Sequence, residues 1–234
     1  MPITDINQQT ISIHRLQEQL KDPLLTALTA MLAILMFVVA PLQATGVVTA
    51  HWFGLACGLI LTAAVFIVSR SAIAVGSILF ALALVVVSTA TRLRHPSVVD
   101  IYLDLTAWLI AGVALSVVVA RAVFSPGRVT FHRIIGAILL YLDIGLIFVA
   151  LFGFVLLFVP KAFNGLPTLK DNLSVASNLV YFSFVTLTSV GYGDIFPMHP
   201  VARSLANVEA IVGQLYPATL LARLVTLELE GRRH

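Results

Sequence analysis

The stretch that decides the fold is Ser189-Val190-Gly191-Tyr192-Gly193-Asp194. It follows a short apolar and aromatic segment, residues 174–188, and precedes a long apolar segment, residues 200–226. The short segment cannot cross a bilayer, because crossing takes about 20 helical residues. In an ordinary strand alternate carbonyl groups point to opposite sides. Glycine adopts positive φ at little steric cost, so the two glycines allow a backbone whose carbonyl oxygens all point toward one axis.

Composition indicates an integral membrane protein. Of the 234 residues, 59% are hydrophobic and 11% are charged, and the mean hydropathy is +1.02. Soluble domains carry about 25% charged residues, so this surface is expected to face hydrocarbon. The net charge of +3 is explained by basic cytoplasmic loops rather than by nucleic acid. Histidines and carboxylates are scattered, which disfavours an enzyme, and the single cysteine permits no intrachain disulfide.

Six apolar segments are long enough, or nearly so, to cross the membrane as helices. We therefore expect an all-α integral membrane protein with six transmembrane helices. Between the fifth and sixth, residues 174–188 are expected to form a re-entrant half-helix, which is tolerated at membrane depth only where protein or a water-filled cavity surrounds it. The six expected spans are 24–40, 51–68, 72–90, 99–120, 131–159 and 200–226.

The chain is predicted to have two membrane parts, divided at a composition break near Phe124. Residues 23–125 are expected to form a four-helix transmembrane bundle, and residues 126–234 a helix, half-helix, loop and helix. Residues 1–22 are expected to be cytoplasmic, either as an amphipathic surface helix or as a solvated tail. With both termini in the cytoplasm, nine of the 14 basic residues lie inside and five outside, which favours this orientation in a cell (inner) membrane.

The loop and its setting resemble potassium channels. Thr186-Leu187-Thr188-Ser189-Val190-Gly191-Tyr192-Gly193-Asp194 is similar to their selectivity-filter signature, and the layout of spans resembles the bacterial six-helix type. The resemblance implies a homotetramer, because one chain supplies one wall of the ion path. It also implies that K+ is bound by Ser189, Val190, Gly191 and Tyr192, with Gly193 completing the filter. Permeant K+ and membrane lipid are the implied partners, with no cofactor.

Two alternatives to a potassium-selective channel remain compatible with this motif. Ser189 stands where the family more often has threonine, which leaves a hydroxyl ligand but allows a less selective cation channel. A non-conducting subunit that assembles with other channel chains and regulates them is the other alternative, although such a subunit need not keep both glycines. The side chains of Val190 and Tyr192 are expected to point away from the ion path, where the Tyr192 hydroxyl could brace the filter.

The resemblance also places supporting residues around the filter. Tyr181 and Phe182 match positions of an aromatic cuff, and we expect Tyr181 to hydrogen-bond Asp194 at the outer mouth. Some relatives carry a carboxylate in the half-helix, four residues before the filter. This chain has Val185 there, so that brace is missing.

Two carboxyl groups fall inside expected spans, where an ionised carboxylate is costly and by default suggests function. We expect Glu209 to support the filter by reaching the hydroxyl of Thr186 or Thr188. Asp143 is expected to meet Tyr216. For both, a structural, hydrogen-bonded carboxyl group remains the alternative.

The last span carries candidate gating residues. Gly213 lies at the position, relative to the filter, where the family keeps a hinge glycine, and Pro217 one turn later removes a backbone donor and can kink a helix. Close helix packing through a small residue is the alternative for Gly213. By helical spacing, Gln214 and Leu221 are expected to face the central cavity.

The fourth span lacks the arginine series of a voltage sensor. Each charge that moves across 100 mV contributes only about 2.3 kcal/mol, so several are needed. This span has one, Arg121, at its inner end, and we expect weak or no voltage dependence. Asp104 near the outer end is expected to pair with Arg92 or Arg94. Residues 227–234 are too few to form a ligand-sensing domain.

Overall fold

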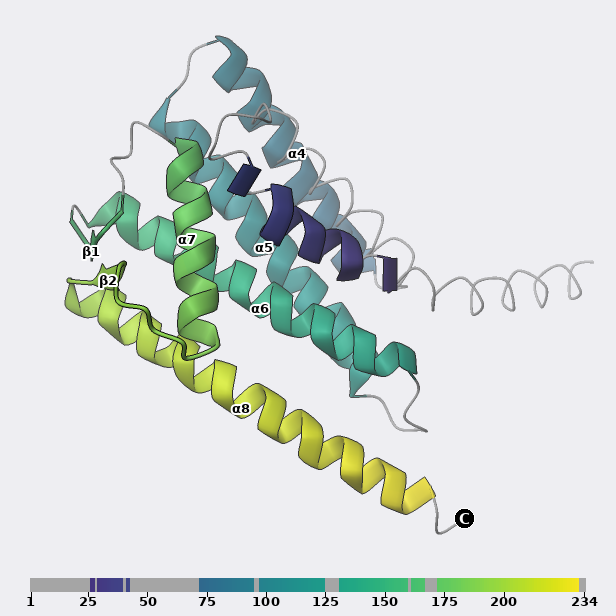
Figure 1. Ribbon diagram of the computed structural model, residues 1–234. Coiled ribbons are helices and arrows are strands. Elements are labelled where there is room, and N and C mark those ends of the chain that lie inside the picture. The colour runs from purple at the N-terminus through teal and green to yellow at the C-terminus, as the bar shows by residue number, and fades with distance from the viewer. Residues whose placement is uncertain are drawn as a thin grey trace, which may run out of the picture.

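The computed structural model of the chain is built almost entirely from helices (Figure 1). It describes residues 26–27, 29–39, 41–42, 72–94, 97–124, 131–159, 161–166 and 172–231. The elements in chain order are η1 (Leu35–Val39), α4 (Ala72–Arg94), α5 (Val98–Val123), α6 (Phe131–Phe158), β1 (Phe163–Asn164), α7 (Asn172–Leu187), β2 (Phe196–Pro197) and α8 (Pro200–Gly231).

Three helical stretches in the described part of the chain are long and apolar enough to cross a membrane: Ile73–Arg92, Val98–Arg121 and Arg133–Phe158. They correspond to the third, fourth and fifth expected spans. The first expected span is described only in part, where a shorter apolar helix covers Thr29–Val39. The second span and the expected cytoplasmic segment 1–22 lie outside the described residues.

The sixth expected span is one continuous helix, α8, but it is not among these three apolar stretches. Polar side chains explain the difference, since α8 carries Arg203, Glu209 and Gln214 along its length. The half-helix is present as α7, which begins two residues earlier than expected and ends at Leu187.

Polar contacts hold α4 and α5 together as a hairpin. Asp100 forms a capping box with Ser97 at the start of α5, and its other oxygen accepts a hydrogen bond from Thr91 at 2.5 Å. Arg92 forms an ion pair with Asp104, which confirms the expected pairing. The capping box engages backbone N–H groups at the start of α5, and the two side-chain contacts join the end of α4 to the first turns of α5.

The described residues pack into two apolar clusters. One joins α4, α5, α6 and the lower end of α7, with Leu115, Val119 and Leu139 among its buried members. The other holds the opposite end of α6 against α7 and the start of α8. Its centre is an edge-to-face group of Phe152, Phe163 and Phe182, with ring centroids 5.0–5.7 Å apart.

Helix α7 lies across α6 and α8, which run side by side (Figure 1). The two-stranded antiparallel sheet pairs Phe163 with Pro197, so it joins the loop after α6 to the loop that precedes α8. Gly165 is required in that junction, because its φ is +83° and a Cβ would lie 2.1 Å from the Asp194 carbonyl oxygen. At the other end of α8, Arg223 donates to the Phe124 carbonyl at 2.9 Å.

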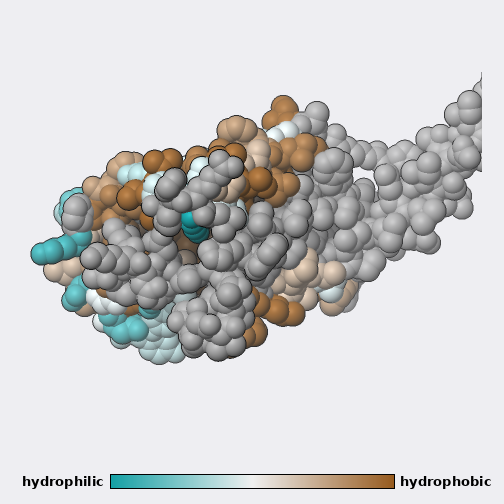
Figure 2. Space-filling view, turned by 90° about the horizontal axis from the view of Figure 1, so that it is seen from above, coloured by the Kyte–Doolittle hydropathy of each residue, from teal (hydrophilic) through white to brown (hydrophobic). Residues whose placement is uncertain are grey.

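The outer surface is largely apolar. Figure 2 shows hydrophobic residues over much of the visible described surface, with hydrophilic residues gathered toward the end that carries β1 and β2. Large exposed apolar side chains occur on α4, α5, α6 and α8, including Phe80, Val117, Ile138 and Ile211. Contiguous exposed apolar surface of this extent indicates contact with lipid or with other copies of the chain.

Candidate functional site

The loop after α7 has the alternating backbone that its glycines predict. Gly191 has φ +60° and Gly193 has φ +82°, whereas the residue before each, Val190 and Tyr192, does not have positive φ. A Cβ added at either glycine would meet no atom within 4 Å, so the requirement for glycine is conformational rather than steric. Ser189 also has positive φ, +58°, which the sequence did not indicate, because serine rarely adopts that region.

Backbone N–H groups at the start of the loop turn back toward α7. Ser189 N–H donates to the Thr186 carbonyl at 2.9 Å. The N–H groups of Val190 and Gly191 both donate to the Val185 carbonyl, at 2.9 and 3.3 Å. These bonds satisfy carbonyl groups at the C-terminus of α7 that have no partner within the helix. The N–H groups of Ser189, Val190 and Gly191 are thus all engaged by carbonyl groups of α7.

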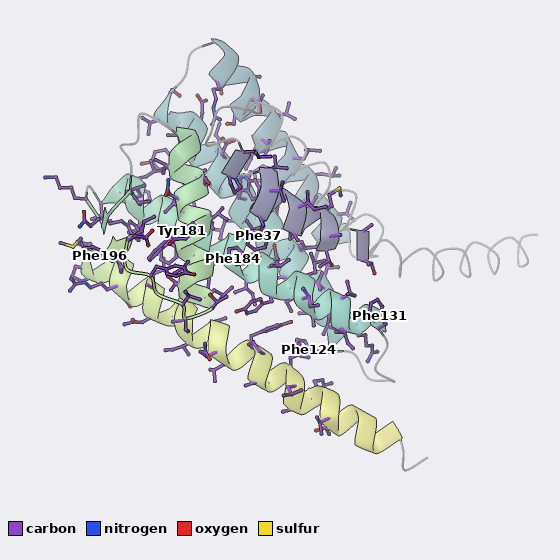
Figure 3. The ribbon with its side chains drawn as sticks, viewed as in Figure 1. Phe37, Phe124, Phe131, Tyr181, Phe184 and Phe196 are labelled. Carbon is purple, nitrogen blue, oxygen red and sulfur yellow. The ribbon has the colours of Figure 1, made fainter. Side chains whose placement is uncertain are left out.

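The outer part of the loop is held through Tyr181. Its hydroxyl donates to Asp194 Oδ1 at 3.0 Å, the hydrogen bond expected at the outer mouth. The Tyr181 ring also stacks on Tyr192, with ring centroids 6.3 Å apart and planes within 4° of each other. Figure 3 shows Tyr181 and Phe184 on different sides of α7, with Phe184 directed toward Phe37. Tyr181 therefore contacts the loop through both its ring and its hydroxyl.

Phe182 and Thr188, which were also expected to support the filter, form their contacts with residues outside the loop. Phe182 is buried in the aromatic group with Phe152 and Phe163, so it fixes α7 against α6 and β1. The Thr188 hydroxyl donates to the Phe184 carbonyl one turn earlier, at 2.6 Å. The roles of both residues as filter supports stay predictions.

Glu209 is fully buried, but its partner differs from the expected one. Its Oε1 lies 2.5 Å from the hydroxyl of Ser183 on α7, not near Thr186 or Thr188. The Ser183 hydroxyl also lies 2.9 Å from the Gly145 carbonyl of α6. A hydroxyl has one hydrogen, and a carbonyl cannot donate, so both contacts are hydrogen bonds only when Glu209 carries a proton and donates. The Ser183 hydroxyl thus connects Glu209 of α8 with α7 and with the Gly145 carbonyl of α6.

The expected contact between Asp143 and Tyr216 is wrong. Asp143 is buried and accepts a hydrogen bond from Ser116 of α5 at 2.6 Å. Tyr216 instead donates to the Ala137 carbonyl at 2.8 Å and stacks on Tyr141. Asp143 of α6 thus faces α5, whereas Tyr216 of α8 packs on α6 at Ala137 and Tyr141.

Gly213 lies against the backbone at the base of the loop. A Cβ there would be 1.9 Å from the Leu187 carbonyl oxygen and 2.7 Å from its carbonyl carbon. This contact favours the close-packing alternative, because only glycine lets α8 approach α7 so closely. Pro217 lies within α8, which continues as one helix through it to Gly231. The role of either residue as a gating hinge stays a prediction.

The next residue along α8 contacts the loop itself. The amide of Gln214 donates to the Ser189 hydroxyl at 2.9 Å. Neither spacing nor motif pointed to this contact, since it depends on how closely α8 approaches the loop. Gln214 and Leu221 are both exposed in the single chain, as residues that face a central cavity would be.

The electrostatic setting favours a cation. Helix α7 ends at Leu187, directly before the loop, so the negative end of its dipole lies beside Ser189. The oxygen atoms available there are the loop carbonyls and the Ser189 hydroxyl, which are ligands of the type that alkali cations take. Among the described residues no group of three or more His, Cys, Asp or Glu side chains could hold a metal ion.

Comparison with known proteins gives a partial match. Over 56 residues the chain is 46% identical to Protein LctB of Bacillus caldotenax, and over 55 residues it is 40% identical to Protein LctB of Geobacillus stearothermophilus. Each alignment covers 24% of this chain, and the chain spans about two fifths of the length of these relatives, 41% and 40%. No solved structure matches.

A family model described as ion channel matches residues 140–229, from the middle of α6 to the end of α8. The match includes α7, the loop with alternating backbone and the close approach of α8. It supports the resemblance to potassium channels at the level of the family. Together with three apolar helices long enough to cross a membrane, it indicates a multi-pass membrane protein whose residues 140–229 match the ion channel family model.

Proposed function

We propose that the chain is a subunit of a potassium-selective channel in which four copies surround one ion path. The observation that carries this proposal is the backbone of residues 189–193, with positive φ at Ser189, Gly191 and Gly193 and with the first three N–H groups bonded to α7. Such a backbone presents a row of carbonyl oxygens that can replace the hydration shell of K+. One chain supplies one side of that row, so the sites require further copies around the axis.

Exposure of the loop supports assembly. Tyr192 is 72% exposed and Val190 is 52% exposed in the single chain, although both are large and lie at membrane depth in the proposed arrangement. Within its own chain Tyr192 is covered only where Tyr181 stacks on its ring, and Val190 is left about half exposed. Neighbouring copies would cover them and fix the width of the path, and the exposed apolar face of α8 would line the contact between copies.

The remaining features follow from the same proposal. The pore part, residues 126–234, would conduct K+ passively, and residues 23–125 would form a surrounding bundle in a cell (inner) membrane with both termini cytoplasmic. Helix α5 carries Arg121 but no arginine series, so opening would depend weakly or not at all on voltage. Lipid, K+ and further copies of the chain are the proposed partners, with neither a cofactor nor nucleic acid.

The test is cation flux from liposomes that contain the purified full-length protein. We expect K+ efflux that Ba2+ blocks and that Na+ does not support. Gly191→Ala is the matched variant, because alanine at φ +60° is strained by roughly 1–2 kcal/mol and the alternation is lost. It should assemble but conduct poorly. Gly76→Ala serves as the control, since a Cβ there meets nothing within 4 Å.

Ser189 favours one second candidate, a less selective cation channel, because serine lacks the methyl group that restricts a threonine hydroxyl. Equal K+ and Na+ flux in the wild-type protein would establish this candidate and overturn K+ selectivity. No flux of either ion, with normal assembly, would refute conduction by this chain alone and would favour the non-conducting regulatory subunit.

A further inference from the structure

The innermost residue of the proposed filter is held by a side chain from another helix. Gln214 Nε2 of α8 lies 2.9 Å from Ser189 Oγ, a normal hydrogen-bond length. The two residues are 25 positions apart in the sequence. Gln214 lies outside the filter signature and next to Gly213, whose missing side chain allows α8 to reach the base of the loop.

Ser189 needs such a contact more than threonine would. Threonine has two heavy atoms on Cβ and is stiff at χ1, whereas serine has one and moves more freely among its rotamers. A hydroxyl ligand that rotates does not define a cation site. The backbone at Ser189 is fixed by positive φ and by its N–H bond to Thr186, so the remaining freedom is in χ1.

The hydrogen-bond inventory is compatible with cation binding. A serine hydroxyl has one hydrogen and two lone pairs. The Gln214 amide occupies one lone pair when it donates, and the second lone pair remains free for a cation. Gln214 therefore fixes the position of the oxygen without removing its capacity as a ligand.

We propose that Gln214 is a specificity-determining residue, which positions the Ser189 hydroxyl as a ligand of the innermost cation site and takes over the restriction that a threonine methyl group provides. This inference rests on the proposed function, because it concerns a site in the same filter. It adds a residue that no filter motif contains, and it connects the inner helix directly to the ion path.

The test is a double-mutant cycle on the full-length protein in detergent, with K+ and Ba2+ binding measured by calorimetry and with flux from liposomes as the second readout. Gln214→Leu should weaken Ba2+ binding about tenfold, the equivalent of about 1.4 kcal/mol, and should lower the ratio of K+ to Na+ flux. Ser189→Thr supplies the second background of the cycle, and its own Ba2+ affinity and flux ratio are the reference for the double variant. In the Ser189→Thr background, Gln214→Leu should have an effect of less than about threefold, because the threonine methyl group already restricts the hydroxyl.

Matched controls separate a local effect from misfolding. Thr219→Val alters a polar residue of the same helix whose hydroxyl bonds only its own helix, to the Leu215 and Tyr216 carbonyls at 2.8 and 3.0 Å, and it should leave binding unchanged. Gln214→Met repeats the test with an unbranched side chain of similar length, should Gln214→Leu fail to assemble.

Each outcome decides the inference. Normal Ba2+ affinity and normal ion selectivity in both Gln214 variants would overturn it, and so would an equal loss in the serine and threonine backgrounds. If the wild-type protein neither binds nor conducts K+, the proposed function fails first and the inference fails with it. If the wild type binds K+ and the Gln214 variants match it, only the inference fails.

Discussion

Gly213→Ala should lower stability and disturb the filter, because the structure places a backbone carbonyl where the new methyl group would lie. The added Cβ would be 1.9 Å from the Leu187 carbonyl oxygen, 2.7 Å from its carbonyl carbon and 3.1 Å from its Cα. Ordinary van der Waals contact begins at 3.4 Å, so α8 and the end of α7 must separate by about 1.5 Å, the difference between 3.4 and 1.9 Å. No side-chain rotation relieves a contact with the backbone.

The magnitude follows from two opposing effects. Extra volume in a packed contact costs roughly 1–3 kcal/mol, and more where the backbone must move. Alanine gains about 1 kcal/mol over glycine in helix propensity. We expect a net loss of about 1–2 kcal/mol in the free energy of unfolding, which lowers the apparent midpoint of thermal unfolding by about 2–8 °C in a chain of this length.

The assay compares Gly213→Ala with Gly76→Ala in the purified full-length protein. Gly76 is also helical, but a Cβ there would meet nothing within 4 Å, so it reports helix propensity alone and should be neutral or stabilising. Thermal unfolding in detergent and Ba2+ block of K+ flux are measured for both variants.

The two interpretations of Gly213 give opposite results. If Gly213 acts only as a flexible hinge, alanine should stabilise the helix and lower the open fraction while Ba2+ block stays normal. If Gly213 acts through close packing, stability falls and Ba2+ block weakens, because the base of the filter has moved. A Gly213→Ala protein as stable as Gly76→Ala, with normal Ba2+ block, would refute the packing argument.

Three further perturbations test separate parts of the structure. Glu209→Gln should change the free energy of unfolding by less than about 1 kcal/mol, because an amide can donate to Ser183 as a neutral carboxyl group does. The shorter Glu209→Asp should lower the free energy of unfolding by about 1–3 kcal/mol. An equal loss of stability in both variants, measured by thermal unfolding, would contradict a donating Glu209. Tyr181→Phe keeps the ring stacked on Tyr192 but removes the hydrogen bond to Asp194, which contributes about 1 kcal/mol. Conduction during sustained opening should then decay about fivefold faster in recordings from bilayers. Unchanged decay would count against a stabilising role of this hydrogen bond at the outer mouth. Asp104→Asn removes the partly exposed ion pair with Arg92 and should change unfolding by less than about 1 kcal/mol; a larger loss would mean that this pair, rather than apolar packing, holds α4 to α5.

Local sequence was sufficient for the elements and for the backbone of the filter. The bounds of α4, α5 and α6 follow from apolar length, because a segment in hydrocarbon must satisfy its own backbone hydrogen bonds and therefore forms a helix. The same holds for α7, whose length allows entry but not crossing. Positive φ at Gly191 and Gly193 also follows from residue type, since glycine carries no Cβ that opposes it.

Local sequence did not determine which residues meet between helices. Glu209 was expected to reach a threonine of the filter signature and instead meets Ser183, one turn earlier on α7. Asp143 was expected to meet Tyr216 and instead meets Ser116. Helical spacing predicts which residues share a face, but each of these partners depends on the rotation and crossing of two helices that are distant in the sequence.

The sequence by itself determined that this chain is a membrane protein of helices, with a loop in which two glycines adopt positive φ. Only the tertiary structure decided what holds that loop in place. Gly213 brings α8 against Leu187, and the same approach puts Gln214 on the Ser189 hydroxyl. The physical reason is that backbone conformation is a property of neighbouring residues, whereas the distance between two helices is set by the packing of all the side chains between them.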